Sequence, residues 1–230
     1  MFHYSKYLFN RAIRKSKQFR IFPVNYGKSD SERCIEIDFA RFYYKGENTV
    51  LDIGYAFSEP RWFEMIQSLH IPNLIGLDPA ANIKPSGYKK VVKGDIRKTK
   101  FSENTFDLAI CISTLEHIGM DNKIYGYGKN DNDFGSQLEA MKEIYRILKP
   151  GGKLLLTLPF GKFINYGWFI QYDLSSLGHL IINSNFKSKS IETYYFKKGW
   201  QFCKLRDCNS IKYQTAKHMA GAIVCLVLEK

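Results

Sequence analysis

The chain has 230 residues, of which 45% are hydrophobic and 15% aromatic. This composition excludes a disordered or low-complexity chain, because it supplies enough apolar material for a core. Lysine and arginine outnumber aspartate and glutamate by 34 to 22, so the formal net charge is +12 and the pI is about 9.4. No stretch approaches the roughly 18 uninterrupted apolar residues of a membrane-spanning helix, and the first residues lack the apolar region of a secretory signal.

The basic excess is concentrated at the N-terminus. Half of the net charge comes from Lys6, Arg11, Arg14, Lys15, Lys17 and Arg20. This predicts an arm that attracts an anionic surface, either lipid headgroups or RNA. The alternative is a solvated extension that packs on the main domain, since charge runs are usually solvated faces. We therefore expect a basic arm and linker over residues 1–33 and one domain over residues 34–230.

The five cysteines are odd in number and scattered along the chain: Cys34, Cys111, Cys203, Cys208 and Cys225. No pair has Cys-x-x-Cys spacing, and no pair of histidines completes a zinc set. We therefore expect no metal site and reduced thiols, Cys203 and Cys208 included, in a cytoplasmic protein. Cys111 lies inside an apolar run and is expected in the core.

After the linker, strands and helices alternate. Short apolar runs predict strands at 50–54, 74–78, 90–95, 106–113, 153–158, 190–196 and 220–228. One helix is expected to begin with Ser58 as its cap and Pro60 in its first turn, with an apolar stripe from Trp62 to Leu69. A second precedes the stop signal at 149–152. This alternation predicts an α/β domain with a mostly parallel sheet, because parallel neighbours need long crossovers.

Two segments between these elements carry aromatic and polar side chains. The segment 119–135 is rich in Gly, Asn, Asp and Tyr, including Tyr125, and is interpreted as a lid or acceptor-binding loop, or as a surface insertion. The segment 160–173 contains Tyr166, Trp168 and Tyr172. Its rings are suited to stacking on a sugar or a planar acceptor, although Trp168 and Phe169 are equally plausible as core residues.

The ends of the first four strands carry the residues most suited to a ligand. In open parallel sheets, ligands bind beyond the carboxyl ends of the strands. Asp52 and Gly54 end the first strand, where an acid suits an amino group and glycine permits a tight turn. Asp78 ends the second, where a carboxylate can accept both hydroxyls of a ribose. The third ends in Asp95 and Ile96, a pair that suits the amino group and ring of an adenine.

At this point the sequence resembles the class I S-adenosylmethionine-dependent methyltransferases, within the type 11 group with small-molecule acceptors. The matching stretches are Val-Leu-Asp-Ile-Gly at 50–54, Gly-Leu-Asp at 76–78, Gly-Asp-Ile at 94–96, Phe-Ser-Glu-Asn-Thr-Phe-Asp at 101–107, Leu-Glu-His-Ile at 115–118 and Arg-Ile-Leu-Lys-Pro-Gly-Gly at 146–152. The resemblance implies a Rossmann-like, doubly wound, seven-stranded sheet, mostly parallel with an antiparallel last strand. It also implies S-adenosylmethionine as cofactor.

The resemblance further implies roles for individual residues. Those expected to bind the cofactor are Asp52, Gly54, Tyr55, Ala56, Asp78, Pro79, Asp95, Ile96, Ser113 and Thr114. One departure from the family is that its usual second and third glycines are Ala56 and Ser58 here, which predicts a narrower fit. His117 is the expected general base and Glu116 a lesser candidate. The alternative for His117 is a histidine that packs or caps the following segment.

Three functions remain open at this level. The first is O-methylation of a small molecule, with a sugar of a surface polysaccharide or lipid-linked glycan as the preferred acceptor, by a cytoplasmic protein that contacts the inner membrane face through residues 1–20. The second is RNA methylation, suggested by the basic pI. Against it, no Asn/Asp-Pro-Pro-Tyr motif follows the fourth strand. The third is a non-catalytic relative that binds the cofactor.

Overall fold

The computed structural model describes residues 26–126, 133 and 135–230. The basic arm expected over residues 1–20 lies outside the described residues, as does most of the second half of the loop at 119–135. Among the helices in the described part of the chain, none is long and apolar enough to cross a membrane.

The centre of the molecule is an eight-stranded sheet with the order β3-β2-β1-β4-β5-β10-β8-β9. Its strands are β1 (Thr49–Ile53), β2 (Asn73–Asp78), β3 (Lys90–Lys93), β4 (Phe106–Ile112), β5 (Leu148–Pro159), β8 (Lys187–Phe196), β9 (Trp200–Cys203) and β10 (Ala222–Glu229). The first five run parallel, and β10 inserts antiparallel between β5 and β8. The Rossmann-like architecture with an antiparallel last strand is therefore confirmed, but the sheet has eight strands instead of seven, because β9 pairs with the edge of β8.

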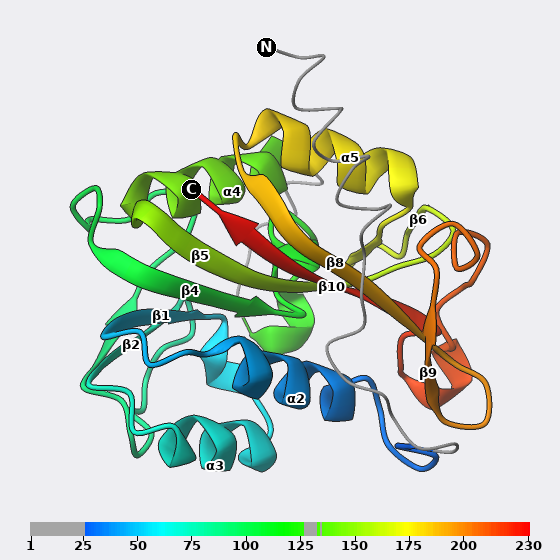
Figure 1. Ribbon diagram of the computed structural model, residues 1–230, viewed down its shortest axis with the longest axis horizontal. Helices are drawn as coiled ribbons and strands as arrows, with labels where there is room; N and C mark the ends of the chain where they lie inside the picture. The colour runs from blue at the N-terminus through cyan, green and yellow to red at the C-terminus, as the bar shows by residue number, and fades with distance from the viewer. Residues whose placement is uncertain (1–25, 127–132, 134) are drawn as a thin grey trace.

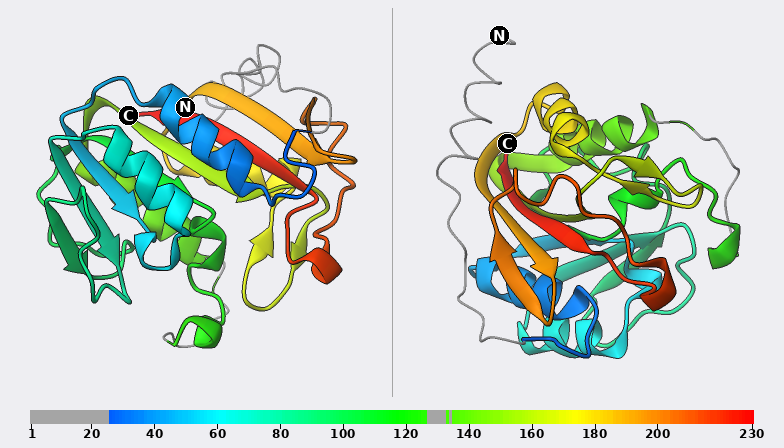
Figure 2. Two further views of the ribbon diagram at one scale, coloured as in Figure 1. Left: turned by 90° about the horizontal axis from the view of Figure 1, so that it is seen from below. Right: turned by 90° about the vertical axis from the view of Figure 1, so that its right-hand side faces the viewer.

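Helices cover both faces of the sheet. The helices α2 (Arg33–Tyr43) and α3 (Pro60–Ser68) lie on one face, and α4 (Gly135–Ile147) and α5 (Leu174–Asn183) lie on the other (Figures 1 and 2). Strand residues alternate between the two cores: Val50 and Leu108 pack toward α2 and α3, whereas Leu51 and Ala109 pack toward α4 and α5. Both faces are buried, which explains the continuous apolar runs.

The sequence prediction missed several elements. These are the helices α2 and α5, the strand β9 and a short hairpin of β6 (Ile164–Asn165) and β7 (Ile170–Gln171). The expected start of α3 was also wrong by one residue. Glu59, with extended backbone, precedes the first helical residue Pro60, and Ser58 makes no capping bond.

The expectation of reduced thiols was wrong at one pair of cysteines. Cys203 at the end of β9 and Cys208 in the following turn form a disulfide, with their Cα atoms 6.5 Å apart. The spacing rules missed it because a disulfide requires only that the two Cα atoms approach in space. Cys111 is fully buried in β4, as expected.

Candidate cofactor and active site

A cavity of about 440 Å³ lies beyond the carboxyl ends of β1 to β4. Because these strands are parallel, their ends meet at one edge of the sheet. The residues from the sequence prediction that line it are Asp52, Gly54, Asp78, Pro79, Asp95, Ile96, Ser113, Thr114 and His117. The topology thus brings the expected strand-end residues together.

Asp52, near the end of β1, is a buried carboxylate with two protein donors. Its Oδ2 accepts hydrogen bonds from Trp62 Nε1, at 2.9 Å, and from the Tyr88 hydroxyl. No described protein group donates to Oδ1 of this cavity-lining residue. Burial raises the pKa of Asp52 from 3.8 to about 6, against the lowering effect of the two hydrogen bonds. Asp52 is therefore mostly ionised at neutral pH.

Gly54 forms the tight turn directly after β1 and lines the cavity. Its φ of 82° lies in the left-handed region, which favours glycine. A Cβ at this position would lie 2.3 Å from Oγ1 of Thr114. That hydroxyl is itself fixed, because it donates a hydrogen bond of 2.9 Å to the carbonyl of Ile112. The loops after β1 and β4 therefore pack directly against each other at Gly54.

Asp78, at the end of β2, is held by backbone amides. Its Oδ1 accepts from the amide of Ala80 at 2.7 Å and its Oδ2 from the amide of Ala56 at 3.2 Å. The side chain is 2% exposed, and burial raises its pKa. A carboxylate oriented in this way keeps lone pairs for hydroxyl donors on a ligand.

Asp95, after β3, is tied to a neighbouring arginine. Its carboxylate accepts from the backbone amide, Nε and Nη2 of Arg97, the last at 2.6 Å. Nη1 of Arg97 donates to Ser136 Oγ in α4. Asp95 remains 43% exposed, and Ile96 beside it is buried. This end of the cavity offers a carboxylate at its rim and an apolar wall.

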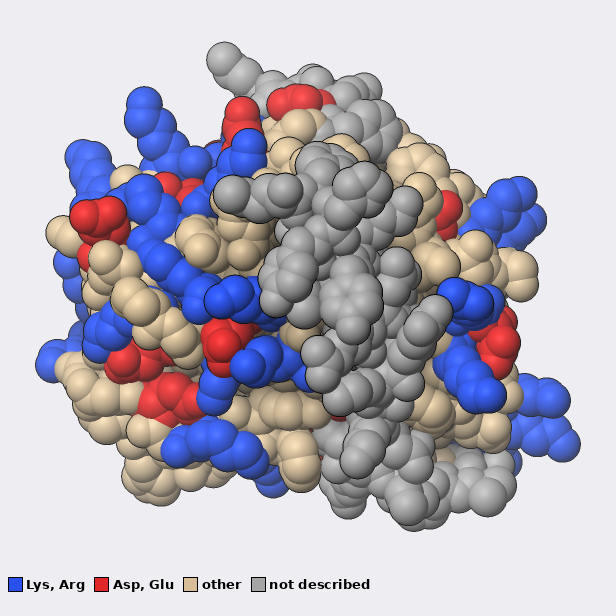
Figure 3. Space-filling model, turned by 45° about the horizontal axis from the view of Figure 1, so that its top comes forward, with Lys and Arg blue, Asp and Glu red and all other residues tan. Residues whose placement is uncertain are grey.

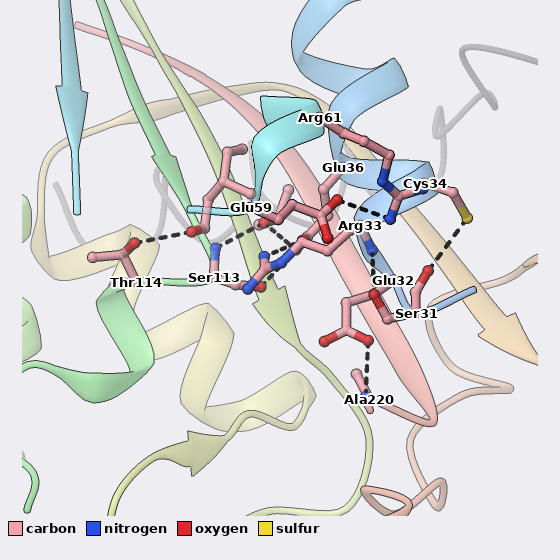
Figure 4. A network of polar contacts seen from close by, with 12 residues as sticks. Ser31, Glu32, Arg33, Cys34, Glu36, Glu59, Arg61, Ser113, Thr114 and Ala220 are labelled. Atoms are coloured by element: carbon pink, nitrogen blue, oxygen red, sulfur yellow. Dashed lines mark hydrogen bonds and ion pairs between the residues drawn. The ribbon is translucent and has the colours of Figure 1, made fainter. Parts of the chain in front are cut away.

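The end of β4 is joined to α2 by a buried carboxylate that the sequence prediction missed. Glu36 is 0% exposed, and its Oε1 accepts from Ser113 Oγ and Thr157 Oγ1, both at 2.6 Å. Its Oε2 accepts from Arg33 Nη1 (Figure 4). Ser113 has a φ of 41°, a strained value for a residue with a side chain. Glu36 thus holds a strained loop against the helix.

His117 lies beside the same loop, and its tautomer is set by a carbonyl. Its Nδ1 is 2.8 Å from the carbonyl of Trp168, which can only accept, so Nδ1 carries the proton. Nε2 of the neutral ring is therefore a hydrogen-bond acceptor in a residue that lines the cavity. Burial lowers the pKa of His117 to about 4, so the ring is neutral at physiological pH. The ring also packs near Trp168 and Tyr125, with centroids at 5.2 and 5.5 Å.

Three of the expected site residues are not part of the cavity wall. Tyr55 is buried against Tyr88, and its hydroxyl donates to the carbonyl of Ile83. Ala56 acts through its backbone amide on Asp78. Glu116 is 2% exposed, and burial raises its pKa well above the ordinary value, which disfavours the ionised form that a base requires.

Comparison with known proteins agrees with this geometry. Residues 64–156 match the family model described as a methyltransferase domain. A sterol 4-C-methyltransferase of Caenorhabditis elegans is 35% identical over 82 residues, which cover 36% of this chain and 20% of that protein. The chain spans about half the length, or less, of the curated relatives it matches.

Solved structures share the fold at low sequence identity. A methyltransferase of Methanosarcina mazei has a TM-score of 0.56 and 16% identity, covering 84% of this chain and 96% of that one. The 1,6-didemethyltoxoflavin-N1-methyltransferase of Burkholderia thailandensis, solved with S-adenosylhomocysteine, has a TM-score of 0.53 and 11% identity, covering 86% and 77%. These neighbours define the class I methyltransferase fold. Together with the match over residues 64–156, they show that the chain contains a methyltransferase domain on this fold.

The residues present fit S-adenosylmethionine, the cofactor of methyltransferases with this fold. The cavity volume lies in the range of about 300–1,000 Å³ that is typical of ligand sites. Acids prevail on its wall, with Asp52, Asp78 and Asp95 at three strand ends, and this suits a ligand that carries a sulfonium, an ammonium and a diol. The one carboxylate of this ligand would in turn require a cationic side chain in the cavity wall.

Proposed function

We propose that this protein transfers a methyl group from S-adenosylmethionine to a hydroxyl group of a small molecule, with His117 as the general base. The observation that carries the proposal is the tautomer of His117, whose Nδ1–H is committed to the Trp168 carbonyl while Nε2 is left to accept a proton. A bound S-adenosylmethionine supplies an electrophilic methyl group. The protein's own task is to position the acceptor, exclude water and remove the proton.

The proposed orientation of the cofactor follows the chemistry of the strand ends. Its adenine lies against Ile96 with its amino group at Asp95, its ribose hydroxyls bind Asp78, and its methionine moiety lies over Asp52 and Gly54. The order of the strands, β3-β2-β1-β4, supports this orientation, because Asp95, Asp78 and Asp52 follow one another in that order along one edge of the sheet. Ser113 and Thr114 then border the methionine moiety from β4.

His117 is suited to assist a hydroxyl acceptor. Its pKa of about 4 keeps the imidazole neutral, so Nε2 is available at every physiological pH. Such a low pKa makes His117 a weak base in the ground state. It is suited to accept the proton only as methyl transfer proceeds, when the hydroxyl becomes strongly acidic. Relatives are named for methylation at different atoms, a sterol carbon and a toxoflavin nitrogen, so similarity alone leaves the acceptor atom open.

The acceptor is proposed to be a sugar or another ring, such as a sugar of a surface polysaccharide or lipid-linked glycan. Two aromatic side chains line the cavity beside His117: the ring centroid of Tyr125 lies 5.5 Å from that of His117, and the centroid of Phe57 lies 5.0 Å from that of Tyr125. Rings of this kind stack on sugar faces and planar molecules. A membrane contact through residues 1–20 remains a prediction of the sequence.

RNA methylation has less support. On the described part of the face in Figure 3, acidic side chains lie among the lysines and arginines instead of leaving a continuous basic stripe. Nucleic-acid footprints are typically clusters of one sign.

The test uses His117→Ala and His117→Gln, with His179→Ala on the exposed side of α5 as the matched control. Formation of S-adenosylhomocysteine is followed with a panel of lipid-linked and free glycans, small phenols and total RNA. Loss of the base should lower kcat by about 10²–10⁴-fold, while calorimetric binding of S-adenosylhomocysteine changes less than threefold.

Unchanged kcat in both His117 variants would contradict its role as base. Methyl transfer to RNA alone would show that the acceptor is RNA instead of a small molecule. If the wild-type protein bound no S-adenosylhomocysteine, both the enzyme and the non-catalytic binding relative would be excluded.

A further inference from the structure

The cavity is lined by two arginines that differ in how their guanidinium groups are used. Arg97 donates through Nε and Nη2 to Asp95 and through Nη1 to Ser136. Arg33 donates through Nη1 to Glu36, and no described protein group accepts from its Nε or Nη2. The Arg33 side chain is 35% exposed while it lines the cavity. A guanidinium has five N–H donors in a planar fork, so Arg33 has donors left for a ligand.

Arg33 is not a loosely placed surface cation. It occupies the first position of α2, and the carboxylate that orients it, Glu36, follows one turn later on the same helix. Glu36 is in turn fixed by the hydroxyls of Ser113 and Thr157 (Figure 4). The guanidinium is therefore held by a chain of hydrogen bonds that reaches the ends of β4 and β5. A charged group oriented in this way can bind a planar anion with little loss of side-chain entropy.

The place of Arg33 along the cavity indicates which part of the cofactor it can contact. The lining residues at β3, β2 and β1 are Asp95, Asp78 and Gly54, and Glu36 connects Arg33 to Ser113 after β4. Arg33 thus lies toward the β4 end, away from Asp95. In the proposed orientation, the portion of the cofactor that reaches this end is the amino acid, which carries one ammonium and one carboxylate. Asp52 is suited to the ammonium.

We infer that Arg33 binds the α-carboxylate of the cofactor's methionine moiety, and that Glu36 is the residue that positions Arg33. The inference rests on the proposed binding and orientation of S-adenosylmethionine. It means that α2, which lies outside the matched methyltransferase domain at 64–156, supplies the cation that the strand ends lack. The same guanidinium could instead bind an anionic group of the acceptor, and the experiment separates these two uses.

The experiment is a thermodynamic cycle, in which the carboxylate is removed from the ligand and the cation is removed from the protein, separately and together. S-adenosylhomocysteine and its decarboxylated analogue, S-adenosyl-3-thiopropylamine, are titrated calorimetrically into wild type, Arg33→Gln and Arg33→Lys. Arg41→Gln, an exposed position in the last turn of the same helix, is the control. In wild type, loss of the carboxylate should weaken binding by about 10–100-fold, the range of a charged hydrogen bond. In Arg33→Gln both ligands should bind alike, and Arg33→Lys should restore part of the difference.

The positioning role of Glu36 is tested with Glu36→Gln, whose amide oxygen can still accept from Ser113 and Thr157. This variant should weaken S-adenosylhomocysteine more than the decarboxylated analogue. It also serves if Arg33→Gln does not fold. Equal affinity of the two ligands in wild type, or an unchanged difference between them in Arg33→Gln, would overturn the inference while leaving the cofactor assignment intact. If wild type binds neither ligand, the proposed function itself fails.

Discussion

The two ends of the cavity use similar residues in opposite ways. At the β3 end, Asp95 and Arg97 satisfy each other and lie partly in solvent, with Asp95 43% exposed. At the β4 end, Glu36 is fully buried and holds Arg33, whose remaining donors are available to a ligand. Exposed ion pairs contribute little, because water screens both charges. We therefore expect binding energy to be concentrated where a charge is buried and oriented, and three predictions test this view.

The largest effect is expected from Gly54→Ala, which disturbs the wall between the two ends. The new Cβ would meet Oγ1 of Thr114 at 2.3 Å, in a backbone with φ of 82°. Binding of S-adenosylhomocysteine should become undetectable, and the free energy of unfolding should fall by more than the roughly 1–3 kcal/mol of backbone strain. Gly151→Ala is the control, because Gly151 has φ of 77° but no atom within 4 Å of its Cβ. Equal effects of the two changes in urea unfolding and calorimetry would contradict the steric argument.

A smaller effect is expected from Asp78 and Asp95, two acids at strand ends that should differ in how much they contribute to ligand binding. Asp78→Asn should weaken S-adenosylhomocysteine by about 10–100-fold, because a buried acceptor of hydroxyl groups loses its charge. Asp95→Asn should weaken it by less than about fivefold, because Asp95 is exposed and already paired with Arg97. Calorimetry on the two variants gives the ratio directly. A larger loss at Asp95 than at Asp78 would reverse the comparison.

The effect that is smallest at neutral pH is the pH dependence of binding that Asp52 causes. Its pKa is raised from 3.8 to about 6, so the carboxylate is lost as the pH falls through 6. Affinity for the ammonium-bearing S-adenosylhomocysteine should then fall by up to about tenfold per pH unit below 6. Because the folded pKa is the higher one, the contribution of Asp52 to stability is complete below pH 3.8 and is lost as the pH rises through 6.

Asp52→Asn provides the control for this dependence. Its amide oxygen can still accept from Trp62 and Tyr88, but it does not titrate. Binding by this variant should be weaker at pH 7 and change less between pH 7 and 5 than binding by wild type. The same slope in both proteins would assign the titration to another group.

The strand ends could be predicted from the sequence because a local pattern determines them. A short apolar run followed by an acid or glycine identifies a strand and its end, and parallel packing then brings Asp52, Asp78 and Asp95 to one edge. The helix α2 was missed, although Ile35, Phe39 and Ala40 form an apolar stripe that includes Glu36. A glutamate within such a stripe was the signal that could have indicated a buried, functional carboxylate.

By itself the sequence determined the α/β class, the family resemblance and which acids end the strands. Only the tertiary structure decided how those groups are used. Glu36 meets Ser113 and Thr157 across 77 and 121 residues, and His117 obtains its tautomer from the carbonyl of Trp168, 51 residues away. Contacts of this range depend on how the helices and loops pack over the sheet edge, so no local pattern encodes which charge is neutralised and which stays available to a ligand.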